Sequence, residues 1–167
     1  MYLELIFRVL LILSTLLCSL VSGFVFAFAI VVMPGIKNLK DREFIRAFQV
    51  MDGVIQNNQP LFIFVWVGSA LTLIASAVLG VWQLDGIQRI FLIITAFIYI
   101  IGVHIPTITI NIPLNNKLQT LDTNSSNDKT QQAVRSNFEP RWNFWNSFRT
   151  VLSSLVSVFL MILLYNL

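Results

Sequence analysis

The sequence has few charged residues, one cysteine and one histidine. Only 11% of its 167 residues are Asp, Glu, Lys or Arg, whereas about 25% is usual in soluble domains. The single cysteine, Cys18, excludes an intrachain disulfide, and it has no Cys or His beside it to form a metal site. The net charge of +3 is not gathered into a basic stripe, so we expect no nucleic-acid partner.

The charges that are present leave four long uncharged runs, over residues 9–36, 53–84, 90–116 and 150–167. An apolar helix of about 20 residues spans the hydrocarbon core of a bilayer, and a helix satisfies every peptide group there. The first run is too long for a cleaved signal peptide, so we expect a retained helix. The sequence predicts one integral membrane domain over residues 1–167, with transmembrane helices at about 9–33, 60–82, 88–110 and 147–165.

Most of the basic residues lie in two long loops. Residues 34–59 and residues 111–146, the first and third loops, contain four Lys or Arg each, whereas the N-terminus and the second loop contain one each. With four spans, the first and third loops share one side of the membrane. Basic loops stay cytoplasmic in multi-pass proteins, so we expect these loops in the cytoplasm and both termini outside.

The loops also contain helical patterns. Residues 41–55 place Phe44, Ile45, Phe48 and Met51 at helical spacing, which predicts an amphipathic helix at the membrane interface. A second helix is expected to begin near Gln131 and to continue into the fourth span. Small residues recur every four positions in the first, second and fourth runs, a spacing that lets membrane helices approach closely. We therefore predict an all-α membrane protein: an antiparallel four-helix bundle with an interfacial helix in the first loop and a helical extension before the fourth span.

The third run contains polar side chains on one helical face. His104, Thr107 and Asn111 stand at i, i+3 and i+7. An ionisable side chain deep in a span is a candidate functional residue. Alternatively, a neutral His104 bonds a threonine or a backbone carbonyl freed by Pro106. Because no HxxH or ExxH pattern and no carboxylate lies within a span, we expect no metal.

Two further polar clusters border the third loop: NIPLNNKL at 111–118 and RWNFWNSFR at 141–149. An interfacial aromatic belt with a snorkelling arginine would explain the tryptophans but not the asparagines. Asparagine suits carbonyl, phenol or quinone oxygens, and an arginine can stabilise an oxyanion. A purely structural cap between helices remains the alternative. The candidate catalytic residues are Arg149, Asn146 and His104, and the candidate substrate-binding residues are Asn111, Asn115, Trp142, Asn143, Trp145 and Thr107.

Four segments carry a family resemblance: residues 23–39, 41–52, 111–118 and 138–153. Together they are similar to the anthrone oxygenase-like family of small bacterial and fungal membrane proteins. The family typically shows Met-Pro-Gly after the first span, an Asn-Val-Pro-Leu-Asn motif after the third, and a Trp-Asn-x-Trp-Asn-x-x-Arg motif before the fourth. The resemblance implies oxidation of a flat hydrophobic aromatic molecule by molecular oxygen, with no cofactor, in a bacterial inner membrane.

A second interpretation is a non-catalytic membrane module that binds lipid or a partner protein. The amphipathic loop helix and the small-residue helix faces favour it. A transporter is disfavoured because the spans contain no acid and only one histidine for ion coupling. The sequence leaves open whether the protein forms a homo-oligomer.

Overall fold

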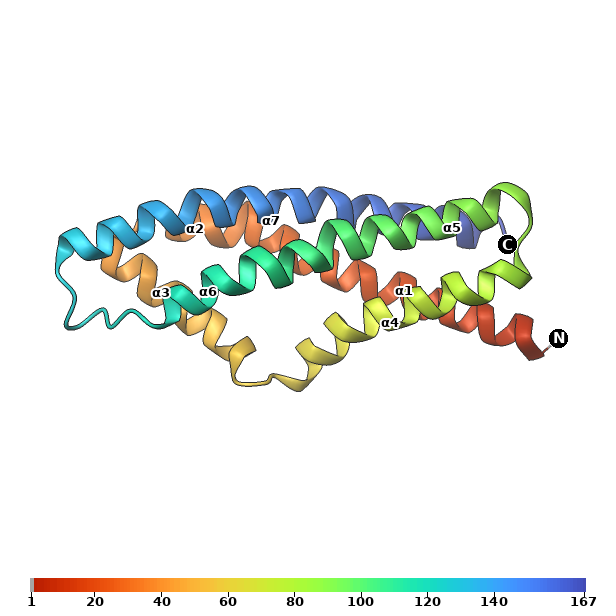
Figure 1. The fold of residues 1–167 in the computed structure, drawn as a ribbon, viewed down its shortest axis with the longest axis horizontal. Coiled ribbons are helices and arrows are strands. Elements are labelled where there is room, and N and C mark those ends of the chain that lie inside the picture. The colour runs from red at the N-terminus through yellow and green to blue at the C-terminus, as the bar shows by residue number, and fades with distance from the viewer. Residues whose placement is uncertain (1) are drawn as a thin grey trace.

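The computed structural model describes residues 2–167, which are helical with short connections (Figure 1). Four continuous helices are long and apolar enough to cross a membrane, so the chain is an integral multi-pass membrane protein. The elements are α1 (Tyr2–Ala27), η1 (Phe28–Val32) and α2 (Met33–Ile36), which form one helix; α3 (Asp41–Gln56); α4 (Pro60–Gln83); α5 (Gly86–Tyr99), η2 (Ile100–His104), η3 (Thr107–Asn111) and α6 (Ile112–Gln119), which form another; and α7 (Asp128–Tyr165).

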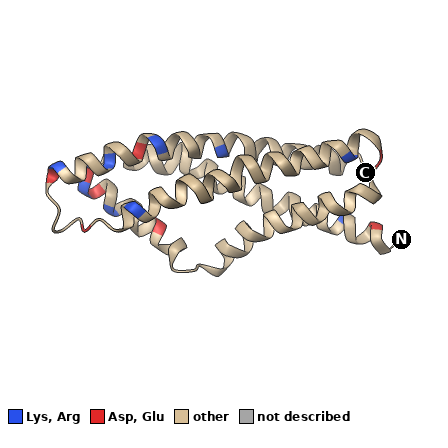
Figure 2. Ribbon diagram, viewed as in Figure 1, with Lys and Arg blue, Asp and Glu red and all other residues tan. Residues whose placement is uncertain are grey.

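The long helices run antiparallel, which confirms the predicted bundle. Both termini and the α4–α5 turn lie at one end, here called the terminal end, and α3 and the α6–α7 connection lie at the other (Figure 1). Most Lys, Arg, Asp and Glu residues gather at this second end, here called the charged end (Figure 2). The 38 residues of α7 extend about 57 Å, well beyond a hydrocarbon core of about 30 Å. The first half of α7 is therefore the helical extension predicted before the fourth span.

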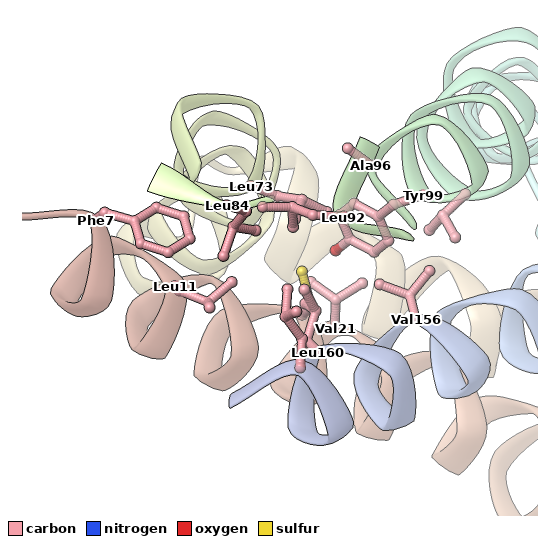
Figure 3. Packing of buried hydrophobic residues seen from close by; sticks show 13 residues of the cluster. Phe7, Leu11, Val21, Leu73, Leu84, Leu92, Ala96, Tyr99, Val156 and Leu160 are labelled. Carbon is pink, nitrogen blue, oxygen red and sulfur yellow. The ribbon is translucent and has the colours of Figure 1, made fainter. Parts of the chain in front are cut away.

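The core of the membrane bundle is apolar. Figure 3 shows Phe7 and Leu11 of α1 beside Leu73, Leu92 and Leu160 of the other helices. Small residues do allow close contacts: the Ser14 and Ser76 hydroxyls lie 3.0 Å apart, as do those of Ser22 and Ser154. In the first span these are not the residues of the four-residue repeat, whose Gly23 and Ala27 are exposed. Cys18 is fully buried in this core.

A second apolar core lies at the charged end. The apolar face of α3 supplies Phe44, Ile45 and Phe48, which pack against Leu118 of α6 and Phe138 of α7. The predicted amphipathic helix is confirmed, but protein rather than lipid covers its apolar face. The reason is that α6 and the first half of α7 lie alongside α3 and offer its apolar face a protein partner.

Arg135 fastens α7 to the start of α3. Its guanidinium donates to the carbonyls of Lys37 and Leu39, at 2.6 and 2.8 Å, and forms ion pairs with Asp41 at 3.0 Å and Glu139 at 2.8 Å. This basic residue of the third loop therefore has a structural role. The clasp holds α3 against the extension and so fixes one wall of the cavity described next.

Candidate functional site

A cavity of about 310 Å³ lies between the two cores, enclosed by α1, α3, α4, the η3–α6 segment and α7. Its volume is at the lower end of the range of about 300–1,000 Å³ found for small-molecule sites. Its aromatic lining is Phe24, Phe28, Phe48, Phe62, Trp66 and Trp142. Its polar lining includes Asp52, Thr107, Asn111, Asn115, Asn146 and Arg149.

The aromatic residues form a nearly continuous frame around the cavity. Successive ring centroids lie 5.5 Å apart from Trp66 to Phe62, 5.2 Å from Phe62 to Phe24, and 5.0 Å from Phe24 to Phe28. The Phe28 ring then lies 5.7 Å from Trp142, which lies 5.4 Å from Phe48. Rings at these separations attract one another edge to face or offset. The frame supplies rigid apolar walls suited to a flat molecule.

Two π-helical turns determine which residues of the third span reach the cavity. The N–H of Ile105 donates to the carbonyl of Ile100, and that of Ile112 donates to Thr107, so each bond joins residues five apart. The turns lie next to Pro106 and Pro113. Proline lacks an N–H and crowds the preceding turn, and a wide turn relieves this conflict.

The wide turns rotate the helix faces. Thr107 and Asn111 line the cavity, whereas His104, before Pro106, does not. The three therefore do not share one cavity-lining face, although their spacing in a regular α-helix predicts it.

Arg149 is the charged group at the inner end of the site. It is 4% exposed, and its two terminal nitrogens donate to Thr107 Oγ1 at 2.7 Å and Asn146 Oδ1 at 3.0 Å. Within residues 2–167 its Nε has no hydrogen-bond partner and no carboxylate lies within 4 Å. A buried cation without a counter-ion is costly, so this guanidinium is well suited to an oxygen or an anion from a ligand.

Neighbouring polar groups hold Arg149 in place. Asn146 uses its amide nitrogen to donate to the carbonyl of Val25 on α1 at 3.0 Å, which leaves its oxygen for the guanidinium. Thr107 donates to the carbonyl of Val103 at 2.6 Å and accepts from Arg149 with the same hydroxyl. Asn111 is 2% exposed, and its Oδ1 finds no donor among the described residues. Asn111 and Arg149 both contribute to the cavity lining.

Asp52 of α3 is the functional candidate that sequence reasoning missed. The residue is 5% exposed, and its carboxylate accepts hydrogen bonds from three side-chain amides, those of Asn115, Gln119 and Gln56. A charged residue of an amphipathic helix usually lies on the solvated face, whereas Asp52 is buried. The helical spacing could have identified it. Asp52 lies four residues after Phe48 and therefore lies on the same, buried face of α3.

The structure does not bring three of the candidates named above into the cavity. The ring of His104 packs against Tyr99 and Trp66, with centroids 4.9 and 5.6 Å apart. Trp145 contacts the rings of its own helix neighbours on the outside of α7, and half-buried Asn143 lies outside the lining. The other six named candidates line the cavity.

The family model for anthrone oxygenase matches residues 56–159, more than half of the chain. The chain belongs to the anthrone oxygenase family. The match contains the cavity residues of α4, of the third span and of α7, whereas Asp52 and the rest of α3 before Gln56 precede it. No curated protein and no solved structure matches the chain.

Two other hollows in this anthrone oxygenase family member lack a built polar site. One, of about 400 Å³ between α4 and α5, is lined by apolar side chains alone. The other, of about 650 Å³ between α6 and α7, has exposed polar and basic residues. Neither contains a buried polar side chain to orient a ligand. Among residues 2–167, no three His, Cys, Asp or Glu side chains gather to hold a metal ion.

Proposed function

We propose that the cavity binds a flat, oxygen-bearing aromatic molecule and promotes its oxidation by molecular oxygen. The observation that carries this proposal is the buried guanidinium of Arg149, which has no counter-ion and faces an aromatic-lined cavity. Family membership supports the same reaction class. The proposed reaction converts a ring CH₂ group next to an aromatic ketone system into a carbonyl, with O₂ as oxidant and water as the second product.

The guanidinium is suited to the charged state that this reaction passes through. When the CH₂ carbon loses a proton, its electron pair spreads into the ring and onto the ketone oxygen. A fixed cation in a site with little water stabilises such an oxyanion strongly, because its charge is weakly screened and already oriented. Arg149 has five N–H donors and uses two for Thr107 and Asn146. Donors therefore remain for a ligand oxygen.

The other lining residues suit a flat, partly polar ligand. The aromatic frame can stack on ring faces. Asn111 has a buried acceptor without a donor, which fits a phenolic hydroxyl on the ligand. An electron-rich anion of this kind can pass electrons to O₂ directly, so the proposal requires no cofactor beyond molecular oxygen.

Oxygen uptake with anthrone as probe tests the proposal. We expect purified protein in mild detergent to consume O₂ faster than a detergent blank, and to form anthraquinone. Arg149→Met should abolish most of this increase, whereas Trp145→Leu, which alters the outer face of α7, should not. If the wild-type protein does not exceed the blank, the proposal is wrong and a non-catalytic, lipid- or partner-binding role gains support.

We also propose that the charged end faces the cytoplasm of a bacterial inner membrane. Eight of the eleven Lys and Arg residues lie in the first and third loops, in support of this orientation. The buried Cys18 leaves a low labelling background, so Ser125→Cys in the α6–α7 connection is a suitable probe. An impermeant maleimide should label it only after the membrane is permeabilised. Labelling in intact cells would reverse the orientation.

A further inference from the structure

The proposed reaction needs a group that removes a proton from carbon. Within residues 2–167, Asp52 is the one carboxylate that lines the cavity, and no Lys, Arg or His nitrogen lies within 4 Å of it. The single histidine, His104, lies outside the lining. Asp52 is thus a buried carboxylate on the cavity wall that no cation neutralises.

The hydrogen bonds of Asp52 leave one acceptor position free. A carboxylate has about four such positions, two on each oxygen. Oδ2 accepts from Gln56 at 2.7 Å and from Gln119 at 3.0 Å, whereas Oδ1 accepts only from Asn115 at 2.7 Å. The remaining position on Oδ1 can receive a proton without displacing any of the three amides.

The side-chain amide of Asn115 cannot rotate to exchange its oxygen and nitrogen positions without losing hydrogen bonds. Its oxygen accepts the indole N–H of Trp142 at 2.8 Å, and that N–H is a donor only. The amide nitrogen of Asn115 must therefore point at Asp52. Neutral amide donors orient the carboxylate. They hold it in place but do not neutralise its negative charge as an arginine or lysine would.

The cavity lining contains one negative side chain, Asp52, and one positive side chain, Arg149. The two do not form an ion pair with each other. Asp52 belongs to α3 and Arg149 to α7, and both line the same space. A carboxylate that takes a proton from carbon, combined with a separate group that stabilises the oxyanion, is a known arrangement for proton abstraction next to a ketone.

We infer, given the proposed function, that Asp52 is the base that removes the proton from the substrate CH₂ group. The proton passes from carbon to Asp52 Oδ1, and the C–H electron pair moves through the ring to the oxygen beside Arg149. Molecular oxygen then adds to the anionic carbon and forms a peroxide, which takes the proton back from Asp52. Loss of water from the resulting hydroperoxide gives the carbonyl product.

Exchange of deuterium from anthrone labelled at its CH₂ group, measured under argon, isolates the proton-transfer step. Without O₂ the anion is reprotonated by solvent, so label loss reports the base alone. Asp52→Asn should slow this exchange by about a hundredfold or more, the usual range for a lost general base. Binding of anthraquinone, which has no such CH₂ group, should persist in the variant.

Two further variants separate the base from the structural role of the amide cluster. Gln49→Met removes bonds from α3 to the carbonyls of Leu118 and Leu121, outside the cavity lining. It should lower the melting temperature and leave the exchange rate of the folded protein unchanged. The exchange of partners D52N/N115D keeps the charge and the hydrogen bonds of the cluster, but moves the carboxylate to α6. It should fold and still exchange far more slowly than wild type.

The outcomes distinguish this inference from the proposed function. A D52N protein that folds, binds anthraquinone and exchanges at the wild-type rate overturns the role of Asp52 and leaves the proposed function intact. If D52N does not fold, a wild-type rate in D52N/N115D has the same consequence. If the wild-type protein neither binds anthraquinone nor speeds exchange above a detergent blank, both the inference and the proposed function are wrong.

Discussion

Replacement of Arg149 by methionine should separate ligand binding from folding. Methionine is apolar and matches the arginine side chain only about as far as Nε, so it replaces the apolar stem and leaves out the charged guanidinium. The variant loses the guanidinium bonds to Thr107 and Asn146 and any bond to a ligand oxygen. Asn146 Oδ1 is left without its donor, whereas the cavity no longer contains an unneutralised cation.

The structure gives the expected magnitudes. A hydrogen bond to a charged group contributes about 1.5–3 kcal/mol, so the affinity for anthraquinone should fall about 10- to 150-fold. The orphaned Asn146 oxygen costs about 1–3 kcal/mol of stability. Removal of a buried cation that has no counter-ion acts in the opposite direction, because the burial of such an ion costs several kcal/mol even after the protein relaxes. We expect the free energy of unfolding to change by less than about 2 kcal/mol, since these effects oppose each other.

Both quantities can be measured on one preparation. Trp66 and Trp142 line the cavity, so anthraquinone should quench tryptophan fluorescence as it binds. Thermal unfolding in the same detergent gives the stability. Arg149→Lys keeps the charge but loses the planar fork, and its affinity should fall between those of wild type and the methionine variant.

Two results would refute this reasoning. Unchanged anthraquinone affinity in Arg149→Met would show that the guanidinium does not contact the ligand. A loss of stability beyond about 4 kcal/mol, the size expected when a buried partner is removed from a true pair, would show that Arg149 is a structural clasp.

Two pairs of substitutions, each with its own control, test the cavity wall and the packing of the helices. Trp142→Phe keeps an aromatic ring but loses the hydrogen bond of the indole N–H, so we expect it to bind anthraquinone more weakly than wild type in titration calorimetry. Trp145→Leu should bind as wild type, because Trp145 does not line the cavity. Equal effects of the two changes would contradict the assigned cavity wall. Gly102→Ala should be less stable than Gly23→Ala, because its Cβ would lie 2.2 Å from Leu152 Cδ1 and the Leu152 side chain must move to admit it. Gly23→Ala, with no atom within 4 Å, should be neutral or stabilise the protein by up to about 1 kcal/mol, and the reverse order of melting temperatures would be inconsistent with the packing.

The helices were predictable because the bilayer imposes a simple rule. Long uncharged runs must be helical, and Arg8, Asp52, Asp85 and Arg149 mark where those runs begin or end. The helix boundaries were less predictable. The start of α7 near Gln131 was predictable, and Asn127 caps it by accepting from the N–H of Thr130, but its packing against α3 depends on tertiary contacts.

The site was only partly predictable because it depends on helical phase. Polar side chains in apolar runs identified Thr107, Asn111 and Arg149, since each must find partners away from lipid. The π-helical turns near Pro106 change the phase, and His104 packs against Tyr99 and Trp66 without joining the cavity lining.

Part of the aromatic frame left no signal in the sequence, although Trp142 was predictable. Phe24 and Phe62 lie in runs where any phenylalanine could face lipid, and only the tertiary structure distinguishes cavity from membrane. Asp52 was missed for a related reason: a charged residue in an amphipathic helix is usually solvated, and its burial depends on α6 and α7 packing over α3.

Mass spectrometry of the small molecules that co-purify with the protein in mild detergent tests the binding site most directly. Wild type and Arg149→Met are prepared in parallel. We expect a flat, oxygen-bearing aromatic compound with the wild-type protein and its loss or strong depletion in the variant. If both preparations contain only ordinary phospholipid, or the same aromatic compound in equal amounts, Arg149 does not anchor such a ligand and the proposed site is wrong.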